Sequence, residues 1–286
     1  MLSRERDWKG MLVSLGSIDK AGHMWGPDDR GPSGQGTDVY RQAHLPYIAR
    51  LADRQVGRLL SALKARGLRD ETLVVLTADH AGQTARRFHG VNEPGRSDFN
   101  WYYGKDPDET YLEPSPALKP LLDTGNVDFS YQDGHVAAWL HDTSRAALVA
   151  GARAMRRLPD VIAAYRRAGA HYVRVGRTGR MSKRERRWWR AYGQRLVDTM
   201  AAPYGPDVVG LLRDETSYGV KGDHGGHQRR IQEIPLAFSW PGLRPAARRE
   251  RLRSVDILPT VLKTMGIRRF RGHRLDGRAA TLVRRR

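Results

Sequence analysis

The stretch Thr72-Leu73-Val74-Val75-Leu76-Thr77-Ala78-Asp79-His80 decides the fold class of this 286-residue chain. Its first six residues are rich in β-branched and apolar side chains, which predicts a strand. The strand ends directly in an acid followed by an imidazole, Asp79-His80. Because adjacent side chains of a strand point to opposite faces, both can bind one ion only if the backbone turns after the strand, and Gly82 permits such a turn.

Two further clusters combine an acid with a histidine. Asp19 and His23 follow the apolar run Met11–Ile18, which predicts a buried strand. Their spacing of four residues places both side chains on one side of the segment if it turns helically. The other cluster, Asp223-His224-Gly225-Gly226-His227, lies in a glycine-rich stretch whose backbone can bend close to an ion or a phosphate.

Together, the three clusters predict a metal site. Carboxylate and neutral imidazole are ligands that suit zinc and similar first-row metals. They suffice for one complete site and most of a second, and two neighbouring ions are a standard arrangement for phosphoryl transfer. Taken singly, each pair has a simpler interpretation as a hydrogen-bonded pair, a surface loop or a solvated helix face. Their shared position at strand ends, where open α/β sheets bind ligands, favours the metal site.

The segment between the first two clusters predicts a helical crossover. Residues Tyr47–Arg66 carry apolar side chains at helical spacing, and Gly67 is a typical residue just after a helix end. A right-handed β-α-β crossover would bring both acid–histidine motifs to the same edge of a sheet. The loop Pro27–Thr37, rich in Gly, Pro and Asp, is expected to line the substrate entrance.

The pattern divides the chain into a core segment (1–90), an inserted cap subdomain (91–215) and a return to the core (216–286). Within the insertion, Phe129–Leu140 predicts a hairpin on an Asp-Gly turn, and Ser144 is expected to cap a helix that runs to Arg157. We expect a further helix over Val161–Tyr165 and a strand over Tyr172–Val175, which together make a small α+β cap. Three histidines of this segment are interpreted as structural: His135, His141 and His171.

The amino-acid composition limits the possible functions of the chain. The chain has no apolar run long enough to span a membrane, and its first ten residues are too charged for a signal peptide. The absence of cysteine excludes disulfides and thiolate ligands. The formal charge of +19 raises nucleic-acid binding as a function class. Arginine dominates the basic residues and is spread along the whole chain, which is typical of codon bias rather than of a binding face.

The densest basic cluster is Lys183-Arg184-Glu185-Arg186-Arg187-Trp188-Trp189-Arg190. Basic residues interleaved with tryptophan can hold a phosphate backbone and stack on bases. The alternative is an amphipathic helix whose tryptophans pack inward and whose arginines are solvated, and this alternative is favoured. The terminal Arg284-Arg285-Arg286 is interpreted as a frayed tail.

These motifs resemble the alkaline phosphatase superfamily, and most closely its branch of type I phosphodiesterases and nucleotide pyrophosphatases, with phosphonoacetate hydrolase nearby. Their order and spacing make the resemblance specific, and it covers roughly residues 10–90 and 215–280. The matching stretches are Ser17-Ile18-Asp19-Lys20-Ala21-Gly22-His23-Met24-Trp25-Gly26, Leu76–His80, Gly222–Gly226, the helix Tyr47–Leu68, the strand Ile234–Phe238, the closing helix Ser254–Leu262 and the turn Leu275–Arg278.

The resemblance implies an α/β fold, a three-layer α/β/α sandwich of alkaline phosphatase type with an inserted small α+β cap. It also implies two divalent ions, zinc or alternatively manganese. Asp19, His23 and His224 would hold one ion, and Asp79 and His80 would hold the other. The ions would flank a tetrahedral phosphorus, activating a hydroxyl nucleophile on one side and neutralising the leaving oxygen on the other.

The sequence departs from the family at its N-terminal side. The family completes the second metal site with an Asp and with a Thr or Ser nucleophile, both well before the Asp19 motif. Residues 1–18 contain no matching strand or nucleophile turn, because Ser3, Ser14 and Ser17 lie in the wrong context. We therefore expect the chain to be the C-terminal part of a family member, without its nucleophile, and any export signal to lie upstream.

Two residues depart from the motifs themselves. The family has Gly where this chain has Ala81, and a positive φ there would strain a non-glycine residue by about 1 kcal/mol or more. His227 is surplus to the pattern; it is either a neighbour of the substrate or metal, or a plain loop histidine, and the second is favoured.

We therefore expect a metal-dependent hydrolase of phosphoesters, either phosphodiesters or nucleotide pyrophosphates, acting on a small-molecule substrate. The alternatives are an inactive fragment or pseudo-enzyme that binds one metal, a sulfatase-like or phosphonate hydrolase, and a basic nucleic-acid-binding module. A sulfatase uses one hard cation and a modified Cys or Ser. The Asp-x-x-x-His pair and the Asp-His pair indicate two metal ions instead, so phosphoesters are favoured as the substrate. No stable nucleic-acid partner and no membrane span are expected.

Overall fold

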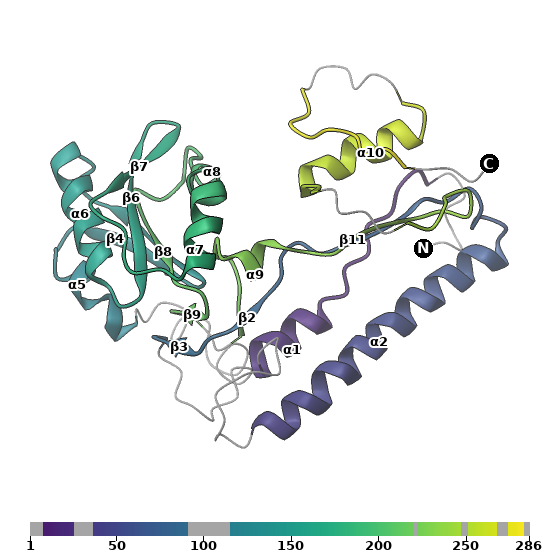
Figure 1. The fold of residues 1–286 in the computed structure, drawn as a ribbon, viewed down its shortest axis with the longest axis horizontal. Coiled ribbons are helices and arrows are strands. Elements are labelled where there is room, and N and C mark those ends of the chain that lie inside the picture. The colour runs from purple at the N-terminus through teal and green to yellow at the C-terminus, as the bar shows by residue number, and fades with distance from the viewer. Residues whose placement is uncertain are drawn as a thin grey trace. The chain divides into compact units, whose positions relative to one another are not determined.

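The fold was examined in a computed structural model, which describes residues 8–25, 37–90, 115–219, 222–246, 251–267 and 274–282. The chain divides into two compact units (Figure 1). The first comprises Met1–Asp53 and Asp79–Ile234, and the second comprises Arg54–Ala78 and Pro235–Arg286. Except for Thr37, the expected entrance loop Pro27–Thr37 lies outside the described residues. Most of the stretch 92–120 and the terminal arginines also lie outside them.

A five-stranded antiparallel sheet, in the order β4-β5-β8-β6-β7, forms the centre of the first unit. Its strands are β4 (Val127–Gln132), β5 (His135–Leu140), β6 (Val161–Ala168), β7 (His171–Val175) and β8 (Val208–Leu212). Strands β4 and β5 pair as a hairpin around Asp133-Gly134, which confirms the predicted Asp-Gly turn.

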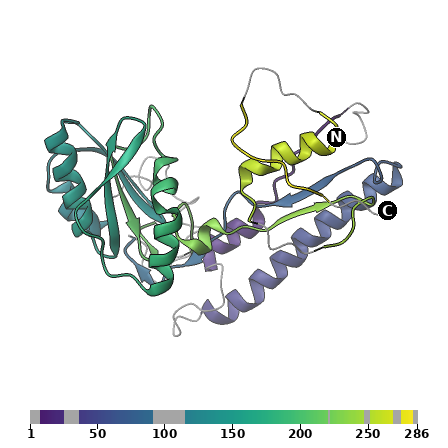
Figure 2. The same ribbon diagram turned by 45° about the horizontal axis from the view of Figure 1, so that its top comes forward.

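Helices cover both faces of this sheet, and Figures 1 and 2 show α6 on one side and α7 and α8 on the other. The layering follows from the side-chain alternation of the strands. Along β8, Val208 and Leu212 pack into one core with Met155 of α6, whereas Val209 and Leu211 pack into a second core with Val197 of α8. A strand that is buried on both faces has to be apolar at every position, and every residue of β8 is apolar and buried.

The helices begin where the sequence provides caps. Helix α6 (Arg145–Arg157) starts after Ser144, whose hydroxyl accepts a hydrogen bond from Ala147 N at 3.3 Å, as predicted. Helix α7 (Lys183–Trp188) has a capping box between Ser182 and Glu185. It continues through a π-helical turn, Trp189–Gly193, into α8 (Gln194–Asp198). The short helices η1 (Pro116–Leu118) and α5 (Lys119–Leu122) precede the sheet.

The helix expected over Val161–Tyr165 was wrong, because this stretch is the buried strand β6. Its five residues are all buried: Val161 and Ala164 belong to one core of the sheet, and Ile162, Ala163 and Tyr165 belong to the other. A short apolar run cannot be assigned to helix or strand by periodicity alone, and here the pairing with β7 and β8 decides it.

Short elements of the first unit position the acid–histidine clusters. Strand β2 (Gln83–Thr84) pairs with β10 (Gly222–Asp223), and β3 (Arg87–Phe88) pairs in parallel with β9 (Thr216–Ser217). Helix α1 (Ser17–Trp25) packs beside β10, and α9 (Arg229–Gln232) follows the glycine-rich loop. The β2–β10 ladder therefore links the segment after His80 directly to the segment before His224.

The strand expected over Met11–Ile18 was also wrong. Residues 10–15 have no strand partner in the part of the chain that the structure describes, and Ser17 already begins α1. Leu12 is 98% exposed. A strand forms its hydrogen bonds with a neighbouring strand, so an apolar run without one does not become a strand. The predicted β-α-β crossover is consequently not formed by the described residues.

The second unit contains the strand predicted from the opening stretch. Strand β1 (Val74–Thr77) pairs antiparallel with β11 (Leu236–Ser239). The long helix α2 (Thr37–Ala65) begins in the first unit and ends in this one, and Gly67 follows it with a φ of 68°. Among the helices that the structure describes, none is long and apolar enough to cross a membrane.

The C-terminal elements of the second unit are held together by one carboxylate. Helices η3 (Ser254–Asp256) and α10 (Ile257–Thr264) form the closing helix. Asp256 accepts hydrogen bonds from Arg253 N and from Arg278 N, both at 2.8 Å. The Asp-Gly-Arg turn at residues 276–278 is thereby fastened to the helix, and these hydrogen bonds lower the pKa of Asp256 despite the opposing effect of burial.

Candidate metal centre

The first cluster lies on α1. Because Asp19 and His23 are one helical turn apart, their side chains share a face, and Asp19 Oδ1 lies 3.4 Å from His23 Nε2. The segment thus has the helical turn on which the expected shared face depended. Asp19 Oδ2 also lies 3.4 Å from Lys20 Nζ, so the carboxylate forms an ion pair with Lys20 in addition to its contact with His23.

The second cluster lies where the chain enters the first unit. His80 Nε2 lies 4.0 Å from Asp19 Oδ1 and 3.4 Å from Asp79 Oδ2. The backbone bends at Asp79, and Ala81 N donates to Ile231 O at 2.9 Å. Ala81 is not strained, since the only non-glycine residues with positive φ in the described ranges are Asp160 and Glu215.

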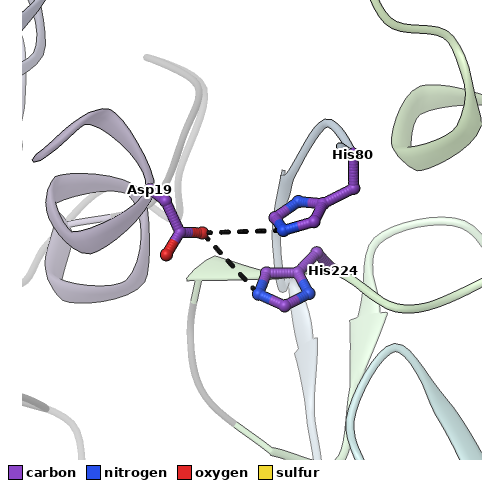
Figure 3. A group of neighbouring side chains, drawn as sticks. All are labelled: Asp19, His80 and His224. Carbon is purple, nitrogen blue, oxygen red and sulfur yellow. Dashed lines mark ion pairs between the residues drawn. The ribbon is translucent and has the colours of Figure 1, made fainter. Parts of the chain in front are cut away.

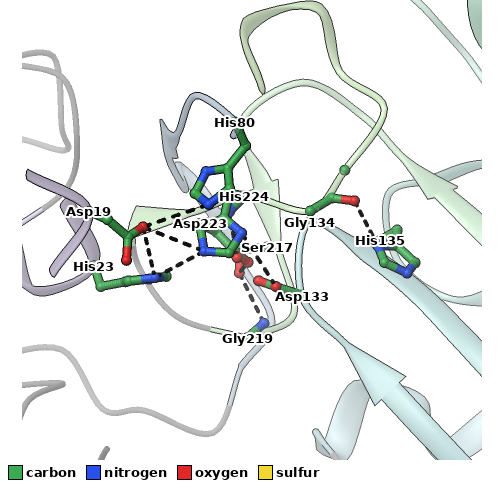
Figure 4. Close-up of polar contacts among 12 residues, drawn as sticks. Asp19, His23, His80, Asp133, Gly134, His135, Ser217, Gly219, Asp223 and His224 are labelled. Atoms are coloured by element: carbon green, nitrogen blue, oxygen red, sulfur yellow. Dashed lines mark hydrogen bonds and ion pairs between the residues drawn. The ribbon is translucent and has the colours of Figure 1, made fainter. Parts of the chain in front are cut away.

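The third cluster completes the group. His224 follows β10, and its Nε2 lies 3.6 Å from Asp19 Oδ1 and 3.0 Å from His23 Nε2. Its ring also stacks on His80, with ring centroids 3.8 Å apart (Figure 4). Figure 3 shows the two imidazoles converging on the carboxylate from one side. Asp19, His80 and His224 each offer one ligand atom, and these atoms all lie within 4.8 Å of one another.

Burial favours the neutral form of two imidazoles of this group, those of His23 and His224. Desolvation is the largest cause that lowers the pKa of His23, and it outweighs the attraction of Asp19. Desolvation, followed by the neighbouring His80 and His23, lowers the pKa of His224 to about 4. A metal ion needs the lone pair of an unprotonated nitrogen, so these two side chains are in the state that binds metal at neutral pH.

The donor set fits a zinc-like ion. Zinc bonds of about 2.0–2.1 Å place two ligand atoms of a tetrahedral site about 3.3 Å apart. The three separations among Asp19 Oδ1, His23 Nε2 and His224 Nε2 are 3.4, 3.6 and 3.0 Å. One carboxylate and two imidazoles are a ligand combination that zinc accepts.

The predicted site residues fall into three groups. Asp19, His23, His80 and His224 lie together around one carboxylate. Asp79 lies at the rim of this group, with 87% of its side chain exposed. His227 is 7% exposed and lies outside the metal-ligand group found among the described residues.

His227 has the environment of an interior histidine. Burial, followed by the nearby His135, lowers its pKa to about 3. Its backbone carbonyl accepts a hydrogen bond from Trp188 Nε1 at 2.8 Å. Its Nδ1 is buried without a hydrogen-bond partner in the described part of the chain. This is the environment expected of a structural histidine, and among the described residues His227 does not belong to the metal-ligand group.

The motif analysis missed Asp133, which the hairpin turn brings next to His224. Asp133 Oδ2 lies 4.0 Å from His224 Nδ1 and accepts a hydrogen bond from Tyr131 OH at 2.9 Å. Burial raises the pKa of Asp133 to about 7. The sequence signal was present, but Asp-Gly between two strands was interpreted as turn chemistry alone.

Asp223 has a supporting role that its place in the motif did not reveal. It is fully buried, it accepts a hydrogen bond from the Ser217 hydroxyl, and its Oδ1 accepts one from His224 N at 2.8 Å. Ser217 Oγ in turn accepts a hydrogen bond from Gly219 N at 3.0 Å. The acid of the third cluster therefore fixes the backbone at His224 and is not a member of the metal-ligand group found among the described residues.

The basic, tryptophan-containing segment has the geometry of the amphipathic alternative. Trp188 is partly buried and donates to the backbone of His227, and Trp189 packs against the second core of the sheet. The Arg174 guanidinium lies 5.4 Å from the centre of a Trp189 ring. The arginines of α7 are exposed. Both tryptophans are thus engaged within the protein rather than presented as a stacking platform.

Comparisons with known proteins agree with these features. The sequence model of the family described as type I phosphodiesterase / nucleotide pyrophosphatase matches residues 1–189. Human ectonucleotide pyrophosphatase / phosphodiesterase 5 has a similar solved structure, with a TM-score of 0.51 and 13% sequence identity. The match covers 90% of this chain and 54% of that one, so the chain spans about half the length of that protein. No curated protein matches significantly. The structural likeness confirms the predicted α/β fold class of alkaline phosphatase type.

Proposed function

The chain belongs to the type I phosphodiesterase / nucleotide pyrophosphatase family, and from this premise we propose that it carries the metal centre of a phosphoester hydrolase. The proposed substrates are phosphodiesters or nucleotide pyrophosphates, and the proposed reaction is phosphoryl transfer assisted by two divalent ions. The observation that carries the proposal is the meeting of Asp19 with three imidazoles from three separate segments.

We assign the first ion to Asp19, His23 and His224. Their three ligand atoms are separated by distances close to those of a tetrahedral zinc site. Two of them are imidazoles that burial keeps neutral, so little free energy is required to remove a proton before binding. The carboxylate supplies the negative charge that a divalent ion needs.

We assign the second ion to Asp79 and His80. His80 Nε2 lies within 4.0 Å of the Asp19 carboxylate, and Asp79 Oδ2 lies 3.4 Å from His80 Nε2. The stacking of His80 on His224 supports neighbouring positions for the two proposed ligand sets. Zinc is the metal favoured by this ligand chemistry, and manganese is the alternative.

When bound, such ions polarise a phosphoryl oxygen, lower the pKa of a coordinated hydroxyl or water, and neutralise charge on the leaving oxygen. The residues of this chain contribute the geometry on which that chemistry depends. Asp19 faces three imidazoles at once, and β10 and the glycine-rich loop fix where His224 points. We assign no nucleophile to the residues that the structure describes.

The proposal is tested by measuring bound metal and hydrolysis together. Protein stripped with a chelator is reloaded with zinc, its metal content is determined, and it is assayed with bis(p-nitrophenyl) phosphate. His23→Ala and His224→Ala are each expected to lose the zinc of the first site. His141→Ala is the matched control, because His141 is exposed and pairs only weakly with Asp128 at 3.6 Å. Full zinc retention in both site variants would overturn the ligand assignment.

A second candidate is a protein that binds one metal without turnover. The exposure of Asp79 favours it, because the second ligand set then consists of one partly exposed imidazole and one solvated carboxylate. Zinc stoichiometry near one, combined with no hydrolysis of phosphate, phosphonate or sulfate esters, would support this candidate. Hydrolysis of the phosphonate or sulfate ester in preference to the phosphodiester would instead support the related hydrolases.

A further inference from the structure

The turn of the β4–β5 hairpin lies directly against the loop that carries His224. We propose that this turn, through Asp133, positions His224 for metal binding, so that the hairpin is part of the metal centre. The inference rests on the proposed function, because it takes His224 to be a metal ligand. It concerns a residue that belongs to none of the three acid–histidine motifs.

Backbone hydrogen bonds fasten the turn to the loop. Gly134 N donates to His224 O at 2.9 Å, and the Gln228 side-chain amide donates to Gly134 O at 3.0 Å. His135 Nδ1 donates to Gly225 O at 3.0 Å. The carbonyl of His224 itself is therefore held by the turn, and a shift of the turn would move the ligand residue.

Glycine makes this close approach feasible. A Cβ atom added at Gly134 would lie 2.2 Å from His224 O and 2.8 Å from Gly226 N. Both are backbone atoms, which cannot rotate away as a side chain can. Gly225 has a φ of 75°, a conformation that L side chains rarely adopt, so the loop can bend at this position. Only glycine at position 134 allows the turn to sit on the loop at this distance.

The Asp133 carboxylate lies behind the imidazole of His224. Its Oδ2 is 4.0 Å from Nδ1, whereas Nε2 of the same ring faces Asp19 and His23 (Figure 4). Tyr131 OH holds this oxygen at 2.9 Å, and Tyr218 N donates to the Asp133 carbonyl at 3.2 Å. The side chain is 13% exposed, so solvent screens its charge only partly.

In its ionised form, Asp133 favours the tautomer of His224 with hydrogen on Nδ1 and the lone pair on Nε2. That tautomer presents the lone pair to the metal position between Asp19 and His23. Metal-bound histidines commonly direct their second nitrogen to a carboxylate or a carbonyl, and removing such a partner typically weakens metal binding about 10–100-fold. Asp133 is in this sense a positioning residue and does not itself reach the metal position.

The test compares zinc dissociation constants, measured by competition with a chromophoric chelator, for the full chain and its variants. Asp133→Asn is expected to weaken zinc binding about 10-fold or more, and Asp133→Glu to recover part of the loss. Asp128→Asn is the matched control, since Asp128 lies on the same strand with its side chain mostly exposed. Gly134→Ala is expected to weaken binding at least as strongly, and thermal unfolding curves establish that each variant is folded.

The outcomes separate this inference from the proposed function. Wild-type binding that depends on His224 but is unchanged in Asp133→Asn and in folded Gly134→Ala would overturn the inference and leave the metal centre intact. Absence of zinc binding by the wild type, or binding indifferent to His224→Ala, would overturn the proposed function and the inference with it. Weakened binding in Asp133→Asn, with Asp128→Asn unchanged, supports both.

Discussion

The Nε2 atoms of His23 and His224 lie 3.0 Å apart, although 201 positions separate the two residues in the sequence. Two neutral imidazoles hold this distance when one Nε2–H donates to the other Nε2. Asp19 Oδ1 lies 3.4 Å from the first nitrogen and 3.6 Å from the second. The triangle therefore accommodates either a shared hydrogen or a cation, and binding of a metal would require the donating ring to carry its hydrogen on Nδ1 instead of Nε2.

Zinc should stabilise the protein through Asp19. A ligand that binds only the folded state raises stability by about 2.7 kcal/mol at 100 times its dissociation constant. We therefore expect zinc to raise the melting temperature of the wild type and to have little effect on Asp19→Asn. Differential scanning fluorimetry with and without zinc measures the shift.

The matched control is Asp123→Asn, which removes an exposed carboxylate that pairs with Lys119 one helical turn away. Such a surface pair contributes little to stability, so this variant should retain the full zinc-dependent shift. An equal shift in Asp19→Asn would show that zinc binds elsewhere.

His224 should titrate far below an ordinary histidine in the metal-free protein. Burial and the adjacent imidazoles lower its pKa to about 4, from the usual value of 6.5. Between these two pH values the unfolded chain binds more protons at this position than the folded chain, so acidification across this window destabilises the fold. NMR titration of the histidine ring signals, assigned by comparison with His224→Gln, gives the midpoint. A midpoint at or above 6.5 would contradict the burial argument.

Replacing His227 by leucine should reduce the acid sensitivity of the protein without affecting metal. The pKa of His227 is lowered to about 3 by burial, so protonation of the unfolded chain below pH 6.5 favours unfolding until the pH approaches about 3. Each unit of pKa shift corresponds to about 1.4 kcal/mol. His227→Leu removes this contribution, and urea unfolding at pH 7 and pH 4.5 measures the difference.

Zinc affinity of His227→Leu is the accompanying control. It should equal that of the wild type, because His227 lies outside the metal-ligand group among the described residues. A clear loss of zinc affinity in this variant would show that His227 lies next to the metal or the substrate.

The five-stranded sheet should account for much of the stability of the first unit. Val208 is fully buried on β8, and Val208→Ala is expected to reduce the free energy of unfolding by about 2 kcal/mol through lost apolar burial and the cavity left behind. Val173→Ala on β7 is the control, since Val173 is exposed and should lose well under 1 kcal/mol. Similar losses in the two variants, measured by chemical denaturation, would contradict the packing described for β8.

Local sequence patterns determined the elements whose physics is local. The i,i+4 spacing of Asp19 and His23 was enough to predict a shared face, since a helical turn fixes that relation without any distant partner. The Asp133-Gly134 turn and the Ser144 cap were also readable, because turn and cap chemistry depends on a few adjacent residues. The spacing and order of the three motifs were sufficient to identify the family.

Only the tertiary structure decided which elements meet. The sequence alone predicted a strand at Met11–Ile18 and a helix at Val161–Tyr165, and both were wrong because strand formation depends on a partner that local pattern does not reveal. The approach of Asp133 to His224 depends on hydrogen bonds between residues about 90 positions apart. Residue types thus determined the available chemistry, whereas packing between distant segments determined which side chains face one another and how strongly burial shifts their pKa values.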